Sequence, residues 1–241
     1  MFHKNPYGSR YITAGNKCAT SYLSELVAES LKFLLKYARS SPKYRFKGVF
    51  HINNIAIIDN TSPVIKLMKV LNKSHEGKKS VRSYDFSTLY TSIPHDHLKS
   101  KMKTFVESTF NCQKERKPFI VISNKWTHFS AKRIATRPCY TSGELLELIY
   151  FIIENSYILF ESKVFRQVLG IPMGTNCAPY LATIFLHVFE YEYLSSLINN
   201  GKIDIAEKLS YMLRFQDDII IFNGDSEFDK HYKLIYPQKW N

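Results

Sequence analysis

The chain of 241 residues is 45% hydrophobic and 15% aromatic, which suits one large globular domain or two small ones with a sizeable core. No apolar run is long enough to span a bilayer and the N-terminus lacks the core of a signal peptide, so we expect neither a membrane-spanning nor a secreted protein. The net charge of +12 divides unevenly, because residues 1–137 carry 25 basic and 8 acidic side chains (net +17) whereas residues 138–241 carry 8 and 13 (net −5).

Charge and cysteine usage both bear on the setting in which the protein works. The uneven charge fits a polyanion-binding surface set against a cation-binding site, and an ordinary solvated basic surface explains it equally well. The four cysteines at positions 18, 112, 139 and 177 are dispersed and lack the spacing of metal ligands. We therefore expect buried free thiols in a reducing compartment and an intracellular protein.

The N-terminal part of the chain predicts turns followed by two helices. Residues 4–12 are rich in turn formers and lead into a short strand, and helices are expected from residues 20–21 and 62–63. Between them, residues 39–49 mix basic, aromatic and turn residues, which suits either contact with a nucleic-acid backbone or a plain surface connection. The apolar faces expected to join the core are Leu23, Leu26, Val27, Leu31, Leu34 and Leu35 in the first helix and Val64, Ile65, Leu67, Met68 and Leu71 in the second.

The next strand-like run, residues 81–86, is interrupted by a single acid. Asp85 is expected at the end of this strand, where a carboxylate can project into a cleft. Tyr90 follows five residues later, and by itself it would be interpreted as a core aromatic. The helix after it carries His95 and His97, a pair without a third ligand nearby, so we expect them to face solvent.

Residues 99–137 form the most basic stretch, with 10 Lys or Arg residues against 2 acidic ones. Lysine and arginine neutralise phosphates by releasing counterions, and interspersed aromatic rings can stack on bases. Residues 119–122 read as a strand, so we expect the charge in this stretch to be functional and the rings to be mostly structural.

The following segment predicts a helix, a hairpin and a conformationally specific loop. Thr141 and Glu144 form a capping box before an apolar helix, and residues 157–168 read as a hairpin whose second strand leads into residues 170–179. That loop contains Gly170, Pro172, Gly174 and Pro179, and small residues allow a backbone to come close to a ligand. A long helix is expected from Pro179 to about residue 198.

Residues 213–222 place two adjacent carboxylates, Asp217 and Asp218, between apolar runs, which predicts a hairpin with the acids at its turn. Aspartate is common in turns, where its side chain bonds its own backbone, and this is the structural explanation. A divalent cation is the functional one, because hard ions such as Mg²⁺ take carboxylate oxygens.

Residues 83–94, 170–179 and 213–222 together resemble motifs A, B and C of reverse transcriptases, in that order. The sequences of these motifs most resemble the Penelope-like retroelement group, which is related to telomerase reverse transcriptase. The resemblance runs from about residue 4 to residue 237. Met173 replaces a glutamine that is common elsewhere in the class but often methionine in this group. Phe215 and Gln216 replace the usual tyrosine and small residue before the paired acids.

The resemblance implies an α+β fold, a polymerase palm with an antiparallel sheet and partial fingers, and a missing thumb. Residues 1–80 would be partial fingers and connecting helices. Residues 81–241 would be the palm with motifs A, B and C, including a basic insertion at about 99–137, within one reverse transcriptase domain.

The implied activity is RNA-directed DNA synthesis, in which two Mg²⁺ ions, with Mn²⁺ as a substitute, promote attack of a primer 3′-hydroxyl on a deoxynucleoside triphosphate. Asp85 and Asp217 would bridge the ions and Asp218 would assist, while the ring of Tyr90 would exclude a 2′-hydroxyl. The resemblance further assigns the incoming nucleotide to Arg10, Lys4, Phe86, Tyr90, Met173 and Gly174, and the template and primer to Gly170, Pro172, Phe215, Gln216, Lys132 and Arg133.

The implied partners are an RNA or DNA template with its primer and deoxynucleoside triphosphates. The implied location is the nucleus, with the cytoplasm as the alternative. Two alternatives remain beside this interpretation. The first is a truncated, inactive nucleic-acid-binding remnant of such an element, because the resembled proteins continue beyond residue 237. The second is an RNA-synthesising polymerase of the same architecture, against which Tyr90 argues.

Overall fold

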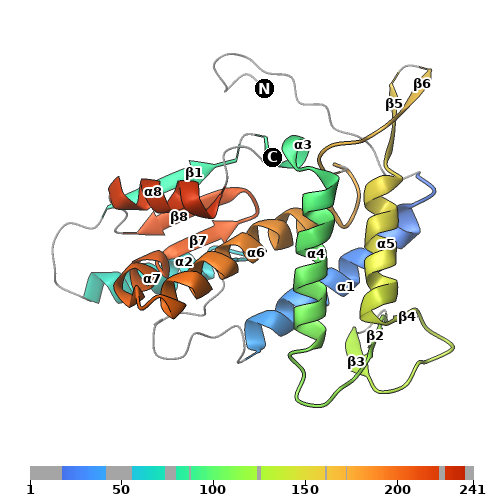
Figure 1. Cartoon of the computed structure of the whole chain (residues 1–241), viewed down its shortest axis with the longest axis horizontal. Helices are drawn as coiled ribbons and strands as arrows, with labels where there is room; N and C mark the ends of the chain where they lie inside the picture. The colour runs from blue at the N-terminus through green and yellow to red at the C-terminus, as the bar shows by residue number, and fades with distance from the viewer. Residues whose placement is uncertain are drawn as a thin grey trace.

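The structure is a computed structural model that describes residues 18–41, 56–73, 80–86, 88–123, 126–160, 162–171, 173–222 and 226–236. Within these ranges helices and small antiparallel sheets alternate along the chain, which confirms the expected mixed α+β class (Figure 1). The helices are α1 (Ser21–Ser40), α2 (Ser62–Lys73), α3 (Leu89–Ser92), α4 (His95–Phe110), α5 (Ser142–Glu154), α6 (Ala178–Asn199), α7 (Ile203–Leu209) and α8 (Ser226–Ile235).

Three sheets are formed by the described residues. The central sheet has the order β1-β8-β7, a second sheet has the order β3-β2-β4, and β5 and β6 form a separate hairpin. All of these strand pairs are antiparallel. The strands are β1 (Val81–Asp85), β2 (Phe119–Val121), β3 (His128–Ser130), β4 (Cys139–Tyr140), β5 (Tyr157–Phe160), β6 (Lys163–Arg166), β7 (Met212–Phe215) and β8 (Asp218–Phe222).

The two faces of the central sheet pack against different helices. Successive residues of a strand point to opposite faces, so Met212, Ile219 and Ile221 share one face and join the main core with α6 and α8. Leu213 and Phe222 lie on the opposite face, where they pack on α2 in a small separate cluster. At the free edge of β7, the segment around Ile57 adds a parallel bridge to Arg214.

The other half of the molecule is helical, and α6 is its centre. This helix is apolar on nearly all sides, which is typical of a helix buried within a core, and it packs against α1, α4, α7 and α8. In Figure 1 the β2–β4 sheet lies at one end of α4 and α5, while α3 and the β5–β6 hairpin lie at the other end. None of the described helices is both long and apolar enough to cross a lipid bilayer.

Local sequence signals place most of these elements correctly. The expected helices beginning near residues 21, 62, 142 and 178 are all present, as are the strand before Asp85 and the two predicted hairpins. The capping box of α5 is complete, because the Thr141 hydroxyl accepts from the Glu144 N–H and the Glu144 carboxylate accepts from the Thr141 N–H. Thr20 precedes α1, but its side chain makes no capping hydrogen bond.

The expected core face of α2 is partly wrong. Leu67 and Leu71 are buried, whereas Ile65 and Met68 are 50% and 45% exposed. The reason is that α2 meets the sheet through a narrow contact with Leu213 and Phe222, which covers only part of its apolar stripe.

The two helix caps give a prediction about stability. Replacing Thr141 with alanine should lower the free energy of unfolding by about 1 kcal/mol, because the Thr141 hydroxyl accepts from the Glu144 N–H and donates to the Glu144 carboxylate, and both hydrogen bonds are lost. Thr20→Ala is the matched control and should cost clearly less, since Thr20 makes no capping bond. Chemical denaturation of both variants measures the difference, and equal losses would contradict the assignment.

Candidate active site

Two of the three predicted catalytic carboxylates lie side by side at the end of the central sheet. Asp85 ends β1 and Asp218 begins β8, and the antiparallel register pairs these two residues directly. Directly paired residues have Cβ atoms about 4.5–5.5 Å apart and point to the same face. Both side chains are exposed, and Asp217 precedes Asp218 in the turn from β7. The register therefore brings together acids that are more than 130 positions apart in the sequence.

Electrostatic repulsion is built into this arrangement. Partial desolvation raises the pKa of the Asp218 carboxyl above its ordinary value, and the charges of Asp217 and Asp85 raise it further. Oxygen donors with clustered negative charge are the donor set that Mg²⁺ takes. In the described part of the chain, however, no three or more side chains of His, Cys, Asp or Glu are arranged so that they could hold a metal ion together. The fit to a cation rests on the paired Asp85 and Asp218, with Asp217 one residue away.

The turn that carries the acids has an unusual backbone. Gln216 has a φ of 54°, in the left-handed region that residues other than glycine rarely adopt. Its carbonyl oxygen accepts a hydrogen bond of 2.8 Å from Nη1 of Arg214. Phe215, which pairs with Asp218 across the hairpin, is 43% exposed. Phe215 and Gln216 thus lie beside the carboxylates, and their contacts with a primer stay predictions.

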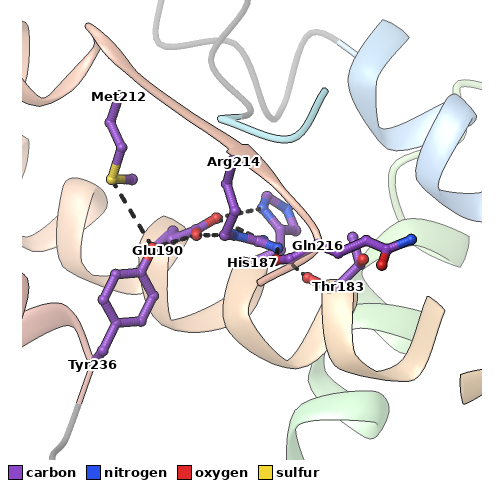
Figure 2. Close-up of polar contacts among 7 residues, drawn as sticks. All are labelled: Thr183, His187, Glu190, Met212, Arg214, Gln216 and Tyr236. Atoms are coloured by element: carbon purple, nitrogen blue, oxygen red, sulfur yellow. Dashed lines mark hydrogen bonds and ion pairs between the residues drawn. The ribbon is translucent and has the colours of Figure 1, made fainter. Parts of the chain in front are cut away.

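Arg214 belongs to a buried polar network that the sequence analysis did not identify (Figure 2). Its guanidinium forms an ion pair with Glu190 of α6, with Nη2 at 3.1 Å from Oε2, and the Tyr236 hydroxyl donates to the same carboxylate. Burial alone would raise the pKa of Glu190, but the charge and hydrogen bonds of Arg214 outweigh it and lower that pKa. The available signal was a lone arginine in an apolar strand and a glutamate within the most apolar part of a long helix, since buried charges are normally paired.

The start of the loop of residues 170–179 docks on α3, which begins four residues after Asp85. The Gly170 N–H donates to the Ile93 carbonyl at 2.8 Å, and the Ile171 N–H donates to the Tyr90 carbonyl at 2.7 Å. The His95 ring lies 2.9 Å from the Gly170 carbonyl, so this half-buried histidine does not simply face solvent as expected. A Cβ on Gly170, whose φ is +85°, would lie 2.4 Å from the Tyr90 oxygen. The glycine is therefore needed where two segments of this chain meet.

Four of the predicted nucleotide-binding residues fall within the described ranges, and one of them, Tyr90, forms part of this junction. Tyr90 is half-buried and packs against the main core, and Phe86 packs on the rings of Tyr232 and Tyr236, with centroids 6.0 and 4.9 Å apart. Met173 is half-buried and Gly174 is exposed. Their contacts with a nucleotide stay predictions, and those assigned to Lys4, Arg10 and Pro172 fall outside the described residues.

Lys132 and Arg133 lie away from α3, and the basic stretch to which they belong is partly neutralised within the chain. Lys132 and Arg133 lie between β3 and β4, at the end of α4 and α5 remote from α3 (Figure 1). Lys132 is exposed, whereas Arg133 pairs with Glu144 and donates to the Cys139 carbonyl. Other basic residues of this stretch that pair with carboxylates are Lys99, Lys101 and Lys117.

Comparison with known proteins gives a likeness of fold. No family model matches the chain, and no curated protein matches it in sequence. Among solved structures, apo telomerase from Candida tropicalis superposes with a TM-score of 0.59 at 15% identity, covering 87% of this chain and 32% of that one. Telomerase from Candida albicans in complex with the TWJ fragment of telomeric RNA gives 0.57 at 14% identity, covering 86% and 32%. The chain thus spans about a third of the length of these telomerases and shares their fold over that part.

The docking of the loop on α3 gives a prediction with a built-in control. Gly170 and Gly201 both have positive φ, at +85° and +72°, but only Gly170 faces atoms that a Cβ would strike. Gly201→Ala should cost only the backbone strain, about 1–2 kcal/mol. Gly170→Ala should cost about 1–3 kcal/mol more, because the new methyl group overpacks the junction. Denaturant unfolding of the two variants measures this difference, and similar losses would show that the close approach does not matter.

The buried His187 gives a prediction about pH. Burial, reinforced by Arg214, lowers its pKa from 6.5 to about 4 against the opposing effect of Glu190. Between pH 4 and pH 6.5 the histidine binds a proton in the unfolded chain but not in the folded one, so protonation favours unfolding. The free energy of unfolding is therefore highest above pH 6.5 and falls as the pH falls towards 4. The free energy of unfolding should fall by about 3 kcal/mol more in the wild type than in His187→Leu over this range. Parallel pH curves for the two proteins would contradict the buried neutral histidine.

Proposed function

We propose that this chain is the catalytic part of a reverse transcriptase that extends a primer 3′-hydroxyl on an RNA or DNA template. Residues 81–241, with the central sheet, would be the polymerase palm, and residues 1–80 would be partial fingers and connecting helices. The observation that carries the proposal is the register that pairs Asp85 with Asp218 at one end of this sheet. The start of the loop of residues 170–179 is hydrogen-bonded to Tyr90 and Ile93, a few residues after Asp85. The first sequence block, residues 83–94, thus contacts both of the others.

The likeness to telomerases supports the proposal independently of the motifs. It covers 86–91% of this chain at TM-scores of 0.54–0.59, and two of those structures contain a fragment of telomeric RNA. The sequence motifs resemble reverse transcriptases of the Penelope-like group, which is related to telomerase reverse transcriptase. The motifs favour a retroelement polymerase, which we expect to work in the nucleus.

The carboxylates would act as ligands for two Mg²⁺ ions, with Mn²⁺ as a substitute. When bound, such ions lower the pKa of the attacking hydroxyl and neutralise the charge on the transferred phosphate. Asp85, Asp217 and Asp218 supply the oxygens, and their mutual repulsion favours taking up a cation. The exposure of Asp85 and Asp218 leaves this end of the sheet accessible to a primer end and a triphosphate.

The remaining residues would orient the substrates. The Tyr90 ring would lie against the sugar of the incoming nucleotide and exclude a 2′-hydroxyl, since the Tyr90 backbone is fixed by the docked loop. Gly174 and Met173 would lie under the nucleotide, and Phe215 and Gln216 would contact the primer end. Base pairing supplies sequence specificity, so the protein needs only to recognise shape and backbone. Exposed basic residues such as Lys132 would bind phosphates in a salt-dependent way.

Primer extension on poly(rA)·oligo(dT) with Mg²⁺, run beside a binding assay on the same duplex, tests the proposal. Asp85→Asn and Asp218→Asn should each reduce extension at least about a hundredfold, since misplacing reacting groups by an ångström alone costs that much. Duplex binding should stay unchanged, because phosphate contacts do not depend on these acids. Asp204→Asn is the charge-matched control: Asp204 is exposed on α7, and this variant should extend normally.

The outcomes separate the alternatives. Near-normal extension by Asp85→Asn would show that the metal assignment is wrong. Salt-dependent binding by the wild type without extension in Mg²⁺ or Mn²⁺ would favour an inactive nucleic-acid-binding remnant. Preferential use of ribonucleotides would favour the RNA-synthesising polymerase.

A further inference from the structure

Arg214 lies two residues before the Gln216 turn but points away from the face that carries the acids. Strand alternation and the register with Ile219 place its side chain on the face packed against α6, whereas Asp218 and Asp85 lie on the opposite face. Its side chain is fully buried. Arg214 is therefore placed neither to bind a metal ion nor to contact nucleic acid.

The guanidinium nevertheless reaches the acidic turn through its hydrogen bonds. Nη1 donates to the Gln216 carbonyl at 2.8 Å, and Nη2 donates to the Thr183 carbonyl at 3.0 Å. Nε and Nη2 both bind the carboxylate of Glu190. The guanidinium thus joins the turn to α6 at two positions, Thr183 and Glu190 (Figure 2). Arginine suits this role because its donors form a rigid fork, which a lysine ammonium does not provide.

The backbone of Arg214 is fixed as well as its side chain. Its N–H donates to the Ala56 carbonyl at 2.7 Å, and its carbonyl accepts from the Ile58 N–H at 2.8 Å. On the other side of the ion pair, Glu190 is held by the Tyr236 hydroxyl. Movement of the turn relative to α6 would therefore break several interactions at once.

The turn has two reasons to move if nothing holds it. Gln216 is in the left-handed region, which is unfavourable for a residue with a Cβ, and the next two residues are like charges that repel each other. A hydrogen bond from a charged donor to the Gln216 carbonyl opposes both tendencies. Because α6 follows directly on the loop of residues 170–179, the same bond sets the acids relative to that loop.

We propose that Arg214, neutralised by Glu190, is a positioning residue that presents Asp217 and Asp218 to a divalent cation at a fixed place relative to α6. This inference rests on the proposed function. It differs from a purely structural role of the ion pair, because it ties the cation affinity of the folded protein to the contact between Arg214 and Gln216.

Titration of the full chain with Mn²⁺, followed by electron paramagnetic resonance, tests the inference without relying on polymerase activity. Arg214→Lys keeps the charge but cannot make the three contacts together, so the Mn²⁺ affinity should fall at least tenfold in protein that is folded by circular dichroism. Tyr236→Phe is the matched control: it removes a neighbour of Glu190 without touching Gln216, so stability should fall while affinity stays within about twofold of the wild type.

A second variant keeps the test decisive if Arg214→Lys does not fold. In Arg214→Met/Glu190→Leu both buried charges are replaced by apolar groups, a change that often preserves stability. This variant should be folded and yet bind Mn²⁺ at least tenfold more weakly. Wild-type affinity in either folded variant would overturn the positioning role while leaving the proposed function intact. If Asp218→Asn binds Mn²⁺ as tightly as the wild type, both the positioning role and the proposed function are overturned.

Discussion

The ion pair between Arg214 and Glu190 is the interaction on which the arrangement of the site depends. Both groups are buried, and removing one partner of such a pair typically costs about 3–5 kcal/mol because the other charge is left unpaired. The pair joins the central sheet to α6 at the position where β7 enters the acidic turn. Packing of apolar side chains could hold a sheet on a helix, but a guanidinium with fixed donors also determines where along the helix the sheet is attached.

A second junction is located where the loop of residues 170–179 meets α3. There the constraint is steric, because only a glycine at position 170 lets the loop backbone approach the Tyr90 carbonyl. Both junctions lead to α6: the loop runs into its first turn, and the acidic turn is bound to its middle. A helix that is apolar on nearly all sides cannot rotate or slide without opening the core, so it serves as a rigid reference for both parts of the site.

Local patterns predicted the elements that carry Asp85 and the paired acids, and the capping box located the start of α5, because these signals depend on neighbours in sequence. The role of Arg214 was not predicted, since its partner Glu190 lies 24 positions earlier and only the packed structure brings them together. Gly170 was expected to approach a ligand, and the structure shows it against the chain's own backbone. The exposure of Ile65 likewise depends on how α2 meets the sheet, which periodicity alone cannot show.

The same limit applies to the charge of the chain. Counting basic residues overstates the free positive surface, because several of those in residues 99–137, Arg133 among them, are neutralised by carboxylates nearby. Lys132 stays exposed between β3 and β4, at the end of α4 and α5 that is remote from α3 (Figure 1). The net charge of the chain therefore does not locate a binding surface, because it counts paired and exposed side chains alike.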